Sequence, residues 1–478
     1  MSLPALALVV ATVASLTTGT ATTQALDWHK CATGTGDAIG IELDQRGAQC
    51  AEITVPMDYS RPNGRQLSVA ISRIKATDPA HRRGVMLLNP GGPGGSGLEM
   101  AVIGSYSPPL GAAYDLIGFD PRFVGRSSPV LCGWSTSTFQ RSAGPDLRSY
   151  AEGVALQAKL AAGCVKSYQD ELPYASTRNT ARDMDAIRQA LGEQRISYYG
   201  VSYGTYLGAV YLQMFGARAD RFVLDSSVDP DTYGPRLFVN QGPAMNDALQ
   251  NFARWAAGKQ GLGDTAQDVL ATVNRLVQSA PVRVGPYTVD GQVLPYLVYS
   301  GLGSDDVTFY AELAAEIRQL RDGSPNPTRL LADKLAGIYT GVGDVSDRAG
   351  TPILCADRAV SHDPSSYYRD IQAHRADEPL FGPLTRNISP CAFWPTKPIE
   401  QPTTVHNGTP VLIAGADGDP FAPYPGQLAM HRDLTGSRMV TQLNAFHHGV
   451  FLGNDCIDAA VVDYLTGGPL PAADKTCA

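Results

Sequence analysis

The sequence lacks several features that mark particular classes of protein. It contains no Cys-x-x-Cys pair, so zinc-ribbon and thioredoxin-like sites are disfavoured. It has no run of basic residues and a formal net charge of −8, so nucleic acid is not an expected partner. It shows no internal repeat. What is present, with 44% hydrophobic and 18% charged residues in a chain of 478, is the composition of a large globular protein.

The N-terminal region lacks a lysine or arginine before its apolar stretch from Leu3 to Leu16. That stretch is too short for a transmembrane helix, and an Ala- and Thr-rich tail follows it, with Ala21 or Ala25 as cleavage points. We expect residues 1–25 to be a signal peptide and the mature protein to be secreted, either free or associated with the cell envelope. No membrane contact is expected after cleavage. An uncleaved anchor and a disordered tail are the alternatives.

The eight cysteines favour export, because an even number fits disulfides formed in an oxidising compartment. Connectivity does not follow from sequence alone. The simplest arrangement pairs neighbours along the chain, namely Cys31–Cys50, Cys132–Cys164, Cys355–Cys391 and Cys456–Cys477. Each such disulfide would stabilise the fold by about 3–4 kcal/mol in the chain-entropy model. Buried free thiols are the alternative reading.

Short apolar segments alternate with helical patterns in the first half of the chain. Strands are expected at 84–90 ("GVMLLNP"), 114–120 ("YDLIGFD"), 195–200 ("RISYYG") and 221–227 ("RFVLDSS"). The segment 177–193 has the spacing of an amphipathic helix. This alternation predicts an α/β protein with a doubly wound, mainly parallel sheet.

The alternation stops after the fourth of these strands. Residues 229–404 contain successive helical patterns without buried strands between them, so we expect a mostly helical cap inserted into the sheet domain. Apolar strands return at 409–417 and 437–445. The core is therefore expected in two parts, 26–228 and 405–478.

Ser202 stands between two glycines in "GVSYG", where a predicted strand becomes a predicted helix. A sharp strand-to-helix turn strains the serine backbone and leaves no room for side chains two positions either side, a demand that Gly200 and Gly204 meet. The turn would lift the hydroxyl to the carboxyl edge of the sheet, where ligands bind in open α/β folds. We expect Ser202 to be a nucleophile; a capping serine in a glycine-rich turn is the alternative.

A serine nucleophile needs a base, and in α/β-hydrolases an acid and then a histidine follow it along the chain. Asp417 and Asp419 follow the strand at 409–417, and His447 and His448 follow the last predicted strand. We favour His448, because the glycine after it permits a tight loop, and Asp419, which lies in a turn-like segment before a proline. The expected catalytic residues are thus Ser202, Asp419 and His448.

Acyl transfer also needs hydrogen-bond donors for the developing oxyanion. One should be the backbone N–H of Tyr203, next to the nucleophile. The other should come from the glycine-rich loop "NPGGPGGSG" at 89–97, where we favour Gly92, with Gly91 behind it. A phosphate-binding loop is disfavoured, because no Gly-Lys-Ser/Thr follows.

The motifs together resemble the secreted tripeptidyl aminopeptidase and proline iminopeptidase branch of the α/β-hydrolases. The matching stretches are "LLNPGGPGGSG", "GFDPRFVGRSSP", "GVSYGTYLGAVY", "LDSSVDP", "GDPFAP", "HHGV" and "YLTGGPLP". They occur in order over nearly the whole mature chain. The resemblance implies an α/β-hydrolase fold with a helical cap, and hydrolysis of peptides from a free amino end without a metal or other cofactor.

Two positions depart from the family pattern. Pro90 stands where the family has a histidine before Gly-Gly-Pro-Gly, and Phe123 stands where it has a glycine. We expect Phe123 to border the substrate pocket and to reshape its acyl side. This departure bears on the substrate class and not on the catalytic residues.

The sequence therefore predicts an exported serine exopeptidase, expected to act as a monomer on short peptides. An esterase or amidase with a small acyl substrate is the alternative, since the same catalytic residues serve both. A peptidase of this kind must neutralise the substrate's α-ammonium, for which Asp357, beside Cys355, is the candidate; a surface or capping acid is the other reading. Glu312 and Glu316 are expected on a solvated helix face.

Overall fold

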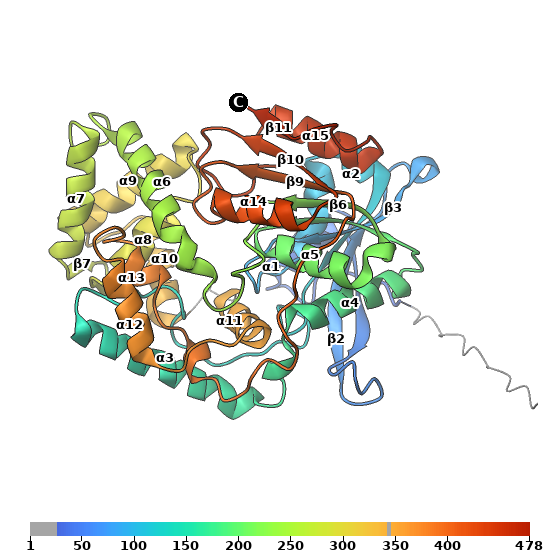
Figure 1. Ribbon diagram of the computed structural model, residues 1–478, viewed down its shortest axis with the longest axis horizontal. Coiled ribbons are helices and arrows are strands. Elements are labelled where there is room, and N and C mark those ends of the chain that lie inside the picture. The colour runs from blue at the N-terminus through green and yellow to red at the C-terminus, as the bar shows by residue number, and fades with distance from the viewer. Residues whose placement is uncertain (1–25, 342–345) are drawn as a thin grey trace, which may run out of the picture.

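The computed structural model describes residues 26–341 and 346–478, so the expected signal peptide at 1–25 lies outside the described residues. The chain forms a sheet lobe and a mostly helical lobe side by side (Figure 1). Within the described ranges, no helix combines the length and apolar character needed to cross a bilayer.

The sheet lobe is built on a single nine-stranded sheet in the order β1-β2-β4-β3-β5-β6-β9-β10-β11. Its strands are β1 (Gln49–Pro56), β2 (Gln66–Ile74), β3 (Gly84–Asn89), β4 (Tyr114–Phe119), β5 (Ile196–Val201), β6 (Ala219–Asp225), β9 (Val411–Ala416), β10 (Ser437–Gln442) and β11 (Lys475–Cys477). Strand β2 pairs antiparallel with both of its neighbours, β1 and β4, and the remaining neighbours pair parallel. The predicted α/β-hydrolase fold class, with its mainly parallel sheet, is confirmed.

Helices cover both faces of this sheet, which explains why β3 and β9 are buried along their whole length. One face packs against α4 (Thr177–Ala190), α5 (Tyr203–Phe215) and α14 (Tyr424–Asp433). The other packs against α2 (Pro108–Ala113) and α15 (Asp455–Thr466). Because β5, β6 and β9 are adjacent and parallel, the segments that follow them meet at one edge of the sheet.

The second lobe, called the cap here, is inserted between β6 and β9 and has a hydrophobic core of its own. Its helices are α6 (Gln241–Ala256), α7 (Ala266–Gln278), α8 (Leu294–Ser300), α9 (Val307–Asp322), α10 (Arg329–Thr340), α11 (Ser346–Asp357), α12 (Pro364–Ala373) and α13 (Gly382–Thr385). A short hairpin of β7 (Val282–Val284) and β8 (Tyr287–Val289) accompanies them.

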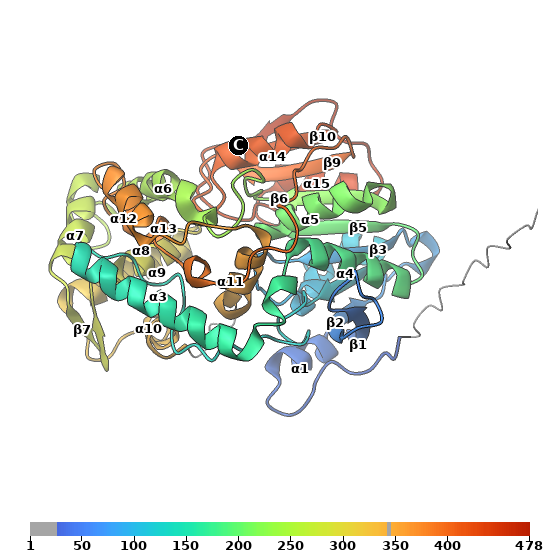
Figure 2. The ribbon, with the colours of Figure 1, turned by 60° about the horizontal axis from the view of Figure 1, so that its bottom comes forward.

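The expected cap boundaries, 229–404, stay a prediction. Two helices pack against the lobe to which those boundaries do not assign them. Helix α3 (Leu147–Tyr168), which the boundary assigns to the core, runs along the cap, where Tyr150 packs with Tyr367 and Ile371 of α12 (Figures 1 and 2). Conversely, α11 packs into the hydrophobic core of the sheet lobe.

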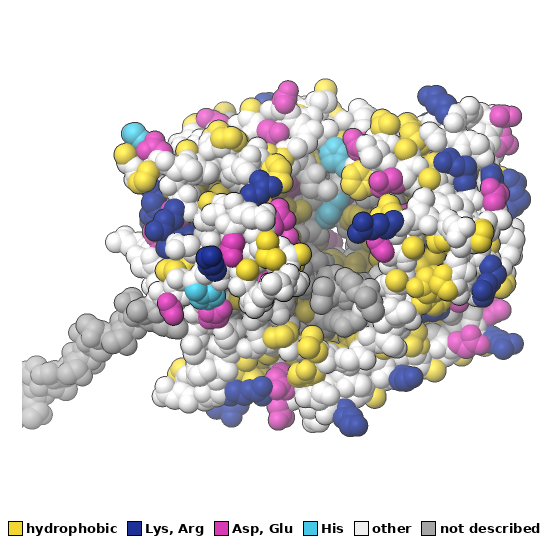
Figure 3. All heavy atoms as spheres, turned by 180° about the vertical axis from the view of Figure 1, so that it is seen from behind, with side chains coloured by type: hydrophobic (Ala, Val, Ile, Leu, Met, Phe, Trp, Pro, Cys, Tyr) yellow, Lys and Arg dark blue, Asp and Glu magenta, His cyan; other side chains and the backbone are white. Residues whose placement is uncertain are grey.

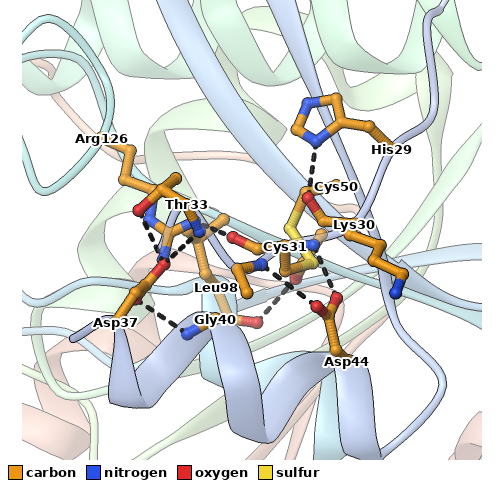
Figure 4. The surroundings of a disulfide bond; sticks show 12 residues. His29, Lys30, Cys31, Thr33, Asp37, Gly40, Asp44, Cys50, Leu98 and Arg126 are labelled. Carbon is orange, nitrogen blue, oxygen red and sulfur yellow. Dashed lines mark hydrogen bonds and ion pairs between the residues drawn. A yellow bond between two sulfur atoms is a disulfide. The ribbon is translucent and has the colours of Figure 1, made fainter. Parts of the chain in front are cut away.

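Four disulfides close the fold, in the same neighbour-to-neighbour arrangement that the cysteine order suggested. The bonds are Cys31–Cys50, Cys132–Cys164, Cys355–Cys391 and Cys456–Cys477. Around the first, Cys31 donates its N–H to Asp44 of α1 (Ala38–Gln45) at 2.7 Å, and Arg126 binds both oxygens of Asp37 (Figure 4). These contacts join the N-terminal segment to the loop after β4, and four disulfides fit an oxidising compartment.

The expectation of a solvated face for Glu312 and Glu316 is wrong for one of them. Glu312 is exposed, but Glu316 is only 2% exposed and binds Lys334 of α10 through both carboxylate oxygens, at 2.8 and 3.0 Å. Because a buried carboxylate needs a partner, this ion pair holds α9 and α10 together inside the cap.

Candidate active site

Ser202 lies in the turn between β5 and α5 with φ 58° and ψ −124°, a strained conformation for a residue other than glycine. Its N–H donates to the carbonyl of Asp225 at 3.0 Å, which fixes the turn against β6. The flanking glycines are required sterically: a Cβ on Gly204 would lie 2.9 Å from the carbonyl oxygen of Asn89, and one on Gly200 would lie 2.6 Å from that of Gly204. The close approach of the backbone at these two positions therefore requires glycine on each side of Ser202.

Asp419 and His448 meet at the same edge of the sheet. The imidazole Nδ1 of His448 lies 3.1 and 3.0 Å from the two carboxylate oxygens of Asp419. Asp419 is 1% exposed, and its Oδ1 also accepts the N–H groups of Phe421 and Ala422, each at 2.9 Å. The carboxylate is thereby held still and oriented towards the ring.

The electrostatic setting of His448 suits a base. Burial by itself lowers the pKa of His448, but the negative charge of Asp419 and its hydrogen bond outweigh burial and raise that pKa above the ordinary value of histidine. A ring with Nδ1 bound to a carboxylate keeps its proton there, which leaves Nε2 to accept one.

The two alternatives, His447 and Asp417, have other partners. His447 has its Nδ1 2.9 Å from Asp305 of the cap and its Nε2 3.2 Å from the amide oxygen of Gln442. Asp417 accepts the backbone N–H of Ala445 at 3.3 Å. The structure thus brings together Asp419 and His448, the members of each pair that the sequence favoured.

Asp225, at the end of β6, supports the loop that carries His448, and the sequence analysis did not single it out. Its buried carboxylate accepts the N–H groups of Val450 and Phe451, at 3.0 Å each, and the hydroxyl of Tyr199 at 2.8 Å. Burial raises the pKa of Asp225, although these hydrogen bonds favour the carboxylate. The signal that could have revealed it is a carboxylate at the end of a buried strand, in "LDSS".

The glycine-rich loop after β3 reaches Ser202. A Cβ on Gly91 would lie 2.9 Å from Cβ of Ser202 and 3.2 Å from the amide nitrogen of Tyr203. The N–H of Gly91 already donates to Asn89 Oδ1 at 3.0 Å, whereas Tyr203 begins α5, where an N–H has no acceptor within the helix. The N–H of Tyr203 is therefore free of a helical acceptor, and the choice of Gly92 as the second donor to the oxyanion stays a prediction.

Asp120, in the stretch "GFDPRFVGRSSP", holds that loop in place. Its carboxylate accepts from the hydroxyl of Ser96 at 2.6 Å and from the N–H groups of Gly97 and Arg126, at 3.0 and 2.7 Å. On the other side of the loop, a Cβ on Gly350 of α11 would collide with the carbonyl oxygen of Pro93. The cap therefore lies directly on the glycine-rich loop.

Comparison with known proteins assigns this arrangement to a family. Residues 84–291 match the model described as alpha/beta hydrolase fold, and residues 378–477 match that described as TAP-like protein. The tripeptidyl aminopeptidase of Streptomyces lividans is 34% identical over 492 residues, covering 95% of this chain and 86% of that protein. The chain belongs to the tripeptidyl aminopeptidase family of α/β-hydrolases. The resemblance drawn from the motifs is confirmed, and the chain is a hydrolase of the serine peptidase type.

Two further relatives carry the names of different activities, one a protease and the other an esterase. The serine protease Hip1 of Mycobacterium tuberculosis is 31% identical, covering 90% of this chain and 87% of that protein. A protein of the same organism named carboxylesterase B is 32% identical, covering 94% of this chain and 89% of that one. Peptidase and esterase names thus both occur among proteins of comparable similarity.

Phe123, where the family resemblance implies a glycine, lies in the hydrophobic core of the sheet lobe and is 2% exposed. Its φ is 68°, a left-handed conformation that glycine adopts without cost and other residues adopt at about 1–2 kcal/mol. Its N–H donates to Ser127 and its carbonyl accepts from Val130, which closes the loop after β4. The structure therefore places the ring among core side chains, and its expected role at the pocket stays a prediction.

We expect Phe123→Gly to lower the free energy of unfolding by about 2–4 kcal/mol. Loss of a buried phenyl ring costs about 3–5 kcal/mol, and relief of the left-handed strain returns about 1 kcal/mol. Denaturant unfolding with the disulfides intact measures the difference. An unchanged unfolding midpoint would show that the ring contributes no packing energy.

Asp357, the candidate anchor for a substrate ammonium, is buried at the end of α11. Its carboxylate accepts the N–H and the hydroxyl of Thr177, at 2.7 and 2.5 Å, and that hydroxyl is 2.9 Å from the hydroxyl of Tyr203. Burial raises the pKa of Asp357 to about 7, against the effect of the Thr177 hydrogen bonds. Asp357 thus links the cap to the start of α4 and, through Thr177, to Tyr203, the residue next to Ser202.

A cavity of about 760 Å³ lies between α6 of the cap and the segment that carries Asp419. Its lining includes the carboxylates of Asp229, Asp247 and Asp417, and the rings of Phe421 and Phe446. On the face opposite Figure 1, the surface is hollowed between the two lobes, and histidine side chains lie in the hollow (Figure 3). The cavity borders the candidate site through Asp419, whereas Ser202 and His448 are not among its lining residues.

Proposed function

We propose that the protein is an exported serine peptidase that releases short peptides from the free amino end of its substrates. One observation carries the proposal: Ser202 occupies a strained strand-to-helix turn at the sheet edge where His448 binds Asp419 at 3.0 Å. The family assignment supplies the peptidase class, and the four disulfides support export.

In the proposed reaction the hydroxyl of Ser202 attacks the peptide carbonyl carbon, and its proton passes to Nε2 of His448. Asp419 holds the proton on Nδ1 and stabilises the imidazolium that results. The oxyanion accepts from the N–H groups of Tyr203 and Gly92. As the tetrahedral intermediate collapses, His448 returns the proton to the leaving amine and an acyl-enzyme remains on Ser202.

Water then completes the cycle. His448 takes a proton from the water molecule as its oxygen attacks the acyl carbon, and the same two N–H groups bind the second oxyanion. The proton returns to the oxygen of Ser202, and the peptide leaves with a free carboxylate. No group other than the protein side chains, backbone and water takes part in these proposed steps.

Selection for a free amino end requires a negative group near one end of the cleft. Asp229, Asp247 and Asp417 line the cavity beside Asp419, and Asp357 is buried at the end of α11, outside that lining. A charge-assisted hydrogen bond to an α-ammonium contributes about 1.5–3 kcal/mol. The cap would close that end of the cleft and exclude chains without a free end.

We expect acetylation of the substrate amine to lower kcat/KM by about tenfold or more, since 1.4 kcal/mol corresponds to about tenfold. Acetylation removes the charge and leaves a buried carboxylate without its partner. A panel of chromogenic peptides of one to four residues, each free and acetylated, measures the ratio and also the preferred length. Equal rates on free and acetylated peptides would overturn the aminopeptidase proposal.

The same panel tests Asp357. If its carboxylate is the anchor, Asp357→Asn reduces the ratio between free and acetylated substrates. If it serves only to hold Thr177, the ratio is unchanged while the melting temperature falls, because Thr177 loses a charged acceptor. Asp247→Asn, at the exposed side of the cavity, provides the comparison for the other acidic lining.

The second candidate function is an esterase or amidase with a small acyl substrate. The observation in its favour is the 32% identity with the protein named carboxylesterase B. Short p-nitrophenyl esters, run beside the peptide panel, separate the two. Efficient ester hydrolysis with no peptide turnover of any length would favour the esterase.

A further inference from the structure

The catalytic histidine is carried by a segment without helix or strand, residues 445–452, called the histidine loop here. Because the loop lacks a regular ladder, its N–H groups depend on side chains and on distant carbonyls for acceptors. From the sheet lobe, Asp225 accepts from Val450 and Phe451, and Ser226 Oγ accepts from Gly449 at 2.8 Å. These contacts hold the part of the loop that follows His448.

The part that precedes and includes His448 is held from the cap. Asp305, between α8 and α9, accepts the N–H of Phe446 through Oδ2 at 2.9 Å and lies 2.9 Å from Nδ1 of His447 through Oδ1. The carbonyl of Gly303 accepts the N–H of His448 itself at 3.0 Å. A segment of three cap residues thus binds three successive residues of the histidine loop.

The same cap segment also packs against Phe421, two residues after Asp419. A Cβ on Gly303 would lie 2.5 Å from the ring of Phe421, so only glycine allows this approach. That ring meets the His448 ring edge-on, with centroids 5.5 Å apart. Phe421 and Phe446 also pack against the hydrophobic core of the cap. The contact is therefore a packed interface and not an isolated surface pair.

Charge strengthens the contact between Asp305 and His447. Both ring nitrogens of His447 face oxygens, Oδ1 of Asp305 and Oε1 of Gln442, an arrangement that suits the doubly protonated ring. The hydrogen bond to Asp305 raises the pKa of His447, and the same bond lowers that of Asp305 against the effect of burial. Their side chains are 18% and 24% exposed, so the pair is largely shielded from solvent.

We propose that Asp305 is a positioning residue that holds the histidine loop from the cap and so keeps His448 in register with Ser202 and Asp419. The inference rests on the proposed role of His448 as the base. It makes the cap part of the catalytic arrangement: besides enclosing substrate, the cap fixes the base. A shift of the segment between α8 and α9 would move His448 with it.

The test compares Asp305→Ala with Asp306→Asn. Asp306 is the adjacent exposed carboxylate; it caps α9 by accepting the N–H of Thr308, and asparagine caps as well as aspartate. We expect Asp305→Ala to lower kcat by about 10- to 100-fold with KM changed less than about threefold, because a base displaced by about 1 Å costs up to about 100-fold. The control is expected to keep both constants.

Asp305→Asn provides the graded variant. Its amide oxygen can still accept from Phe446, while the charge opposite His447 is lost, so we expect a kcat between those of the wild type and Asp305→Ala. If the alanine variant fails to fold, the kcat of Asp305→Asn relative to Asp306→Asn decides the question. Equal kcat for Asp305 variants and control, or an effect on KM alone, would overturn the proposal.

A second readout separates this proposal from the proposed function. The rate at which a fluorophosphonate labels Ser202 depends on His448 but not on whether the natural substrate is a peptide. Slower labelling of Asp305→Ala supports the positioning role even if no peptide is hydrolysed. Wild-type labelling of His448→Ala would instead show that the proposed catalytic base, and not the cap contact, is wrong.

Discussion

Ser202→Ala is expected to abolish turnover, with kcat reduced on the order of 10⁵- to 10⁶-fold. Without the hydroxyl no acyl-enzyme can form, and the N–H groups of Tyr203 and Gly92 can only stabilise attack by water. The backbone at position 202 is strained with either side chain, since alanine and serine meet the same restriction at φ 58°. We therefore expect the melting temperature to change by no more than about 2 °C, as for a change of a few tenths of a kcal/mol.

A fluorophosphonate should label the wild-type enzyme at Ser202 alone, as identified by peptide mass spectrometry. Ser105→Ala is the matched control, because Ser105 is exposed and, within the described residues, its hydroxyl donates to the nearby carbonyl of Val102. It should keep both labelling and turnover. Persistent labelling of the Ser202→Ala protein would place the nucleophile elsewhere.

His448→Ala should lower kcat by a similar factor, and Asp419→Asn by about 10⁴-fold, because an amide favours the wrong tautomer of the ring. The pH profile adds a signed prediction. The base acts only when neutral, so activity falls as the pH drops through the raised pKa of His448. Asp419→Asn removes the charge that raises this pKa, so its acidic limb should shift to lower pH.

The choice within each pair of neighbours is tested by the same assay. Asp417→Asn keeps an oxygen that can accept from Ala445, and we expect it to cost far less than Asp419→Asn. His447→Ala is expected to cost less than His448→Ala, since it disturbs position and not proton transfer. If either neighbour proved the more damaging change, the assignment within that pair would be wrong.

Much of the fold and of the candidate site follows from local patterns. The buried strands stand out because they are apolar along their whole length, and the turn at Ser202 stands out because Gly200 and Gly204 answer a steric demand within five residues. Chain order then leads to Asp419 and His448. These inferences are possible from sequence because each depends on contacts that are close in sequence or on a fixed order of strands.

Contacts between segments that are distant in sequence could not be predicted from local patterns. Asp225 binds Val450 of the histidine loop across 225 positions, and Asp305 binds His447 across 142 positions. No local sequence pattern relates either aspartate to that loop. The packing of α3 on the cap and the burial of Glu316 against Lys334 likewise depend on tertiary placement. Phe123 was expected to border the pocket, although a phenyl ring in a left-handed turn packs equally well into a core.

The order of the catalytic groups along the chain has a consequence for biosynthesis. Ser202 is made early, whereas Asp419 and His448 belong to the last part of the chain, and Asp305 lies between them. Under the proposed assignment, a nascent chain made only as far as β6 carries the nucleophile Ser202 without its acid and its base. In this proposed arrangement, hydrolytic capacity would arise only after residues 419–448 have been made and the cap segment 303–305 has packed against the histidine loop.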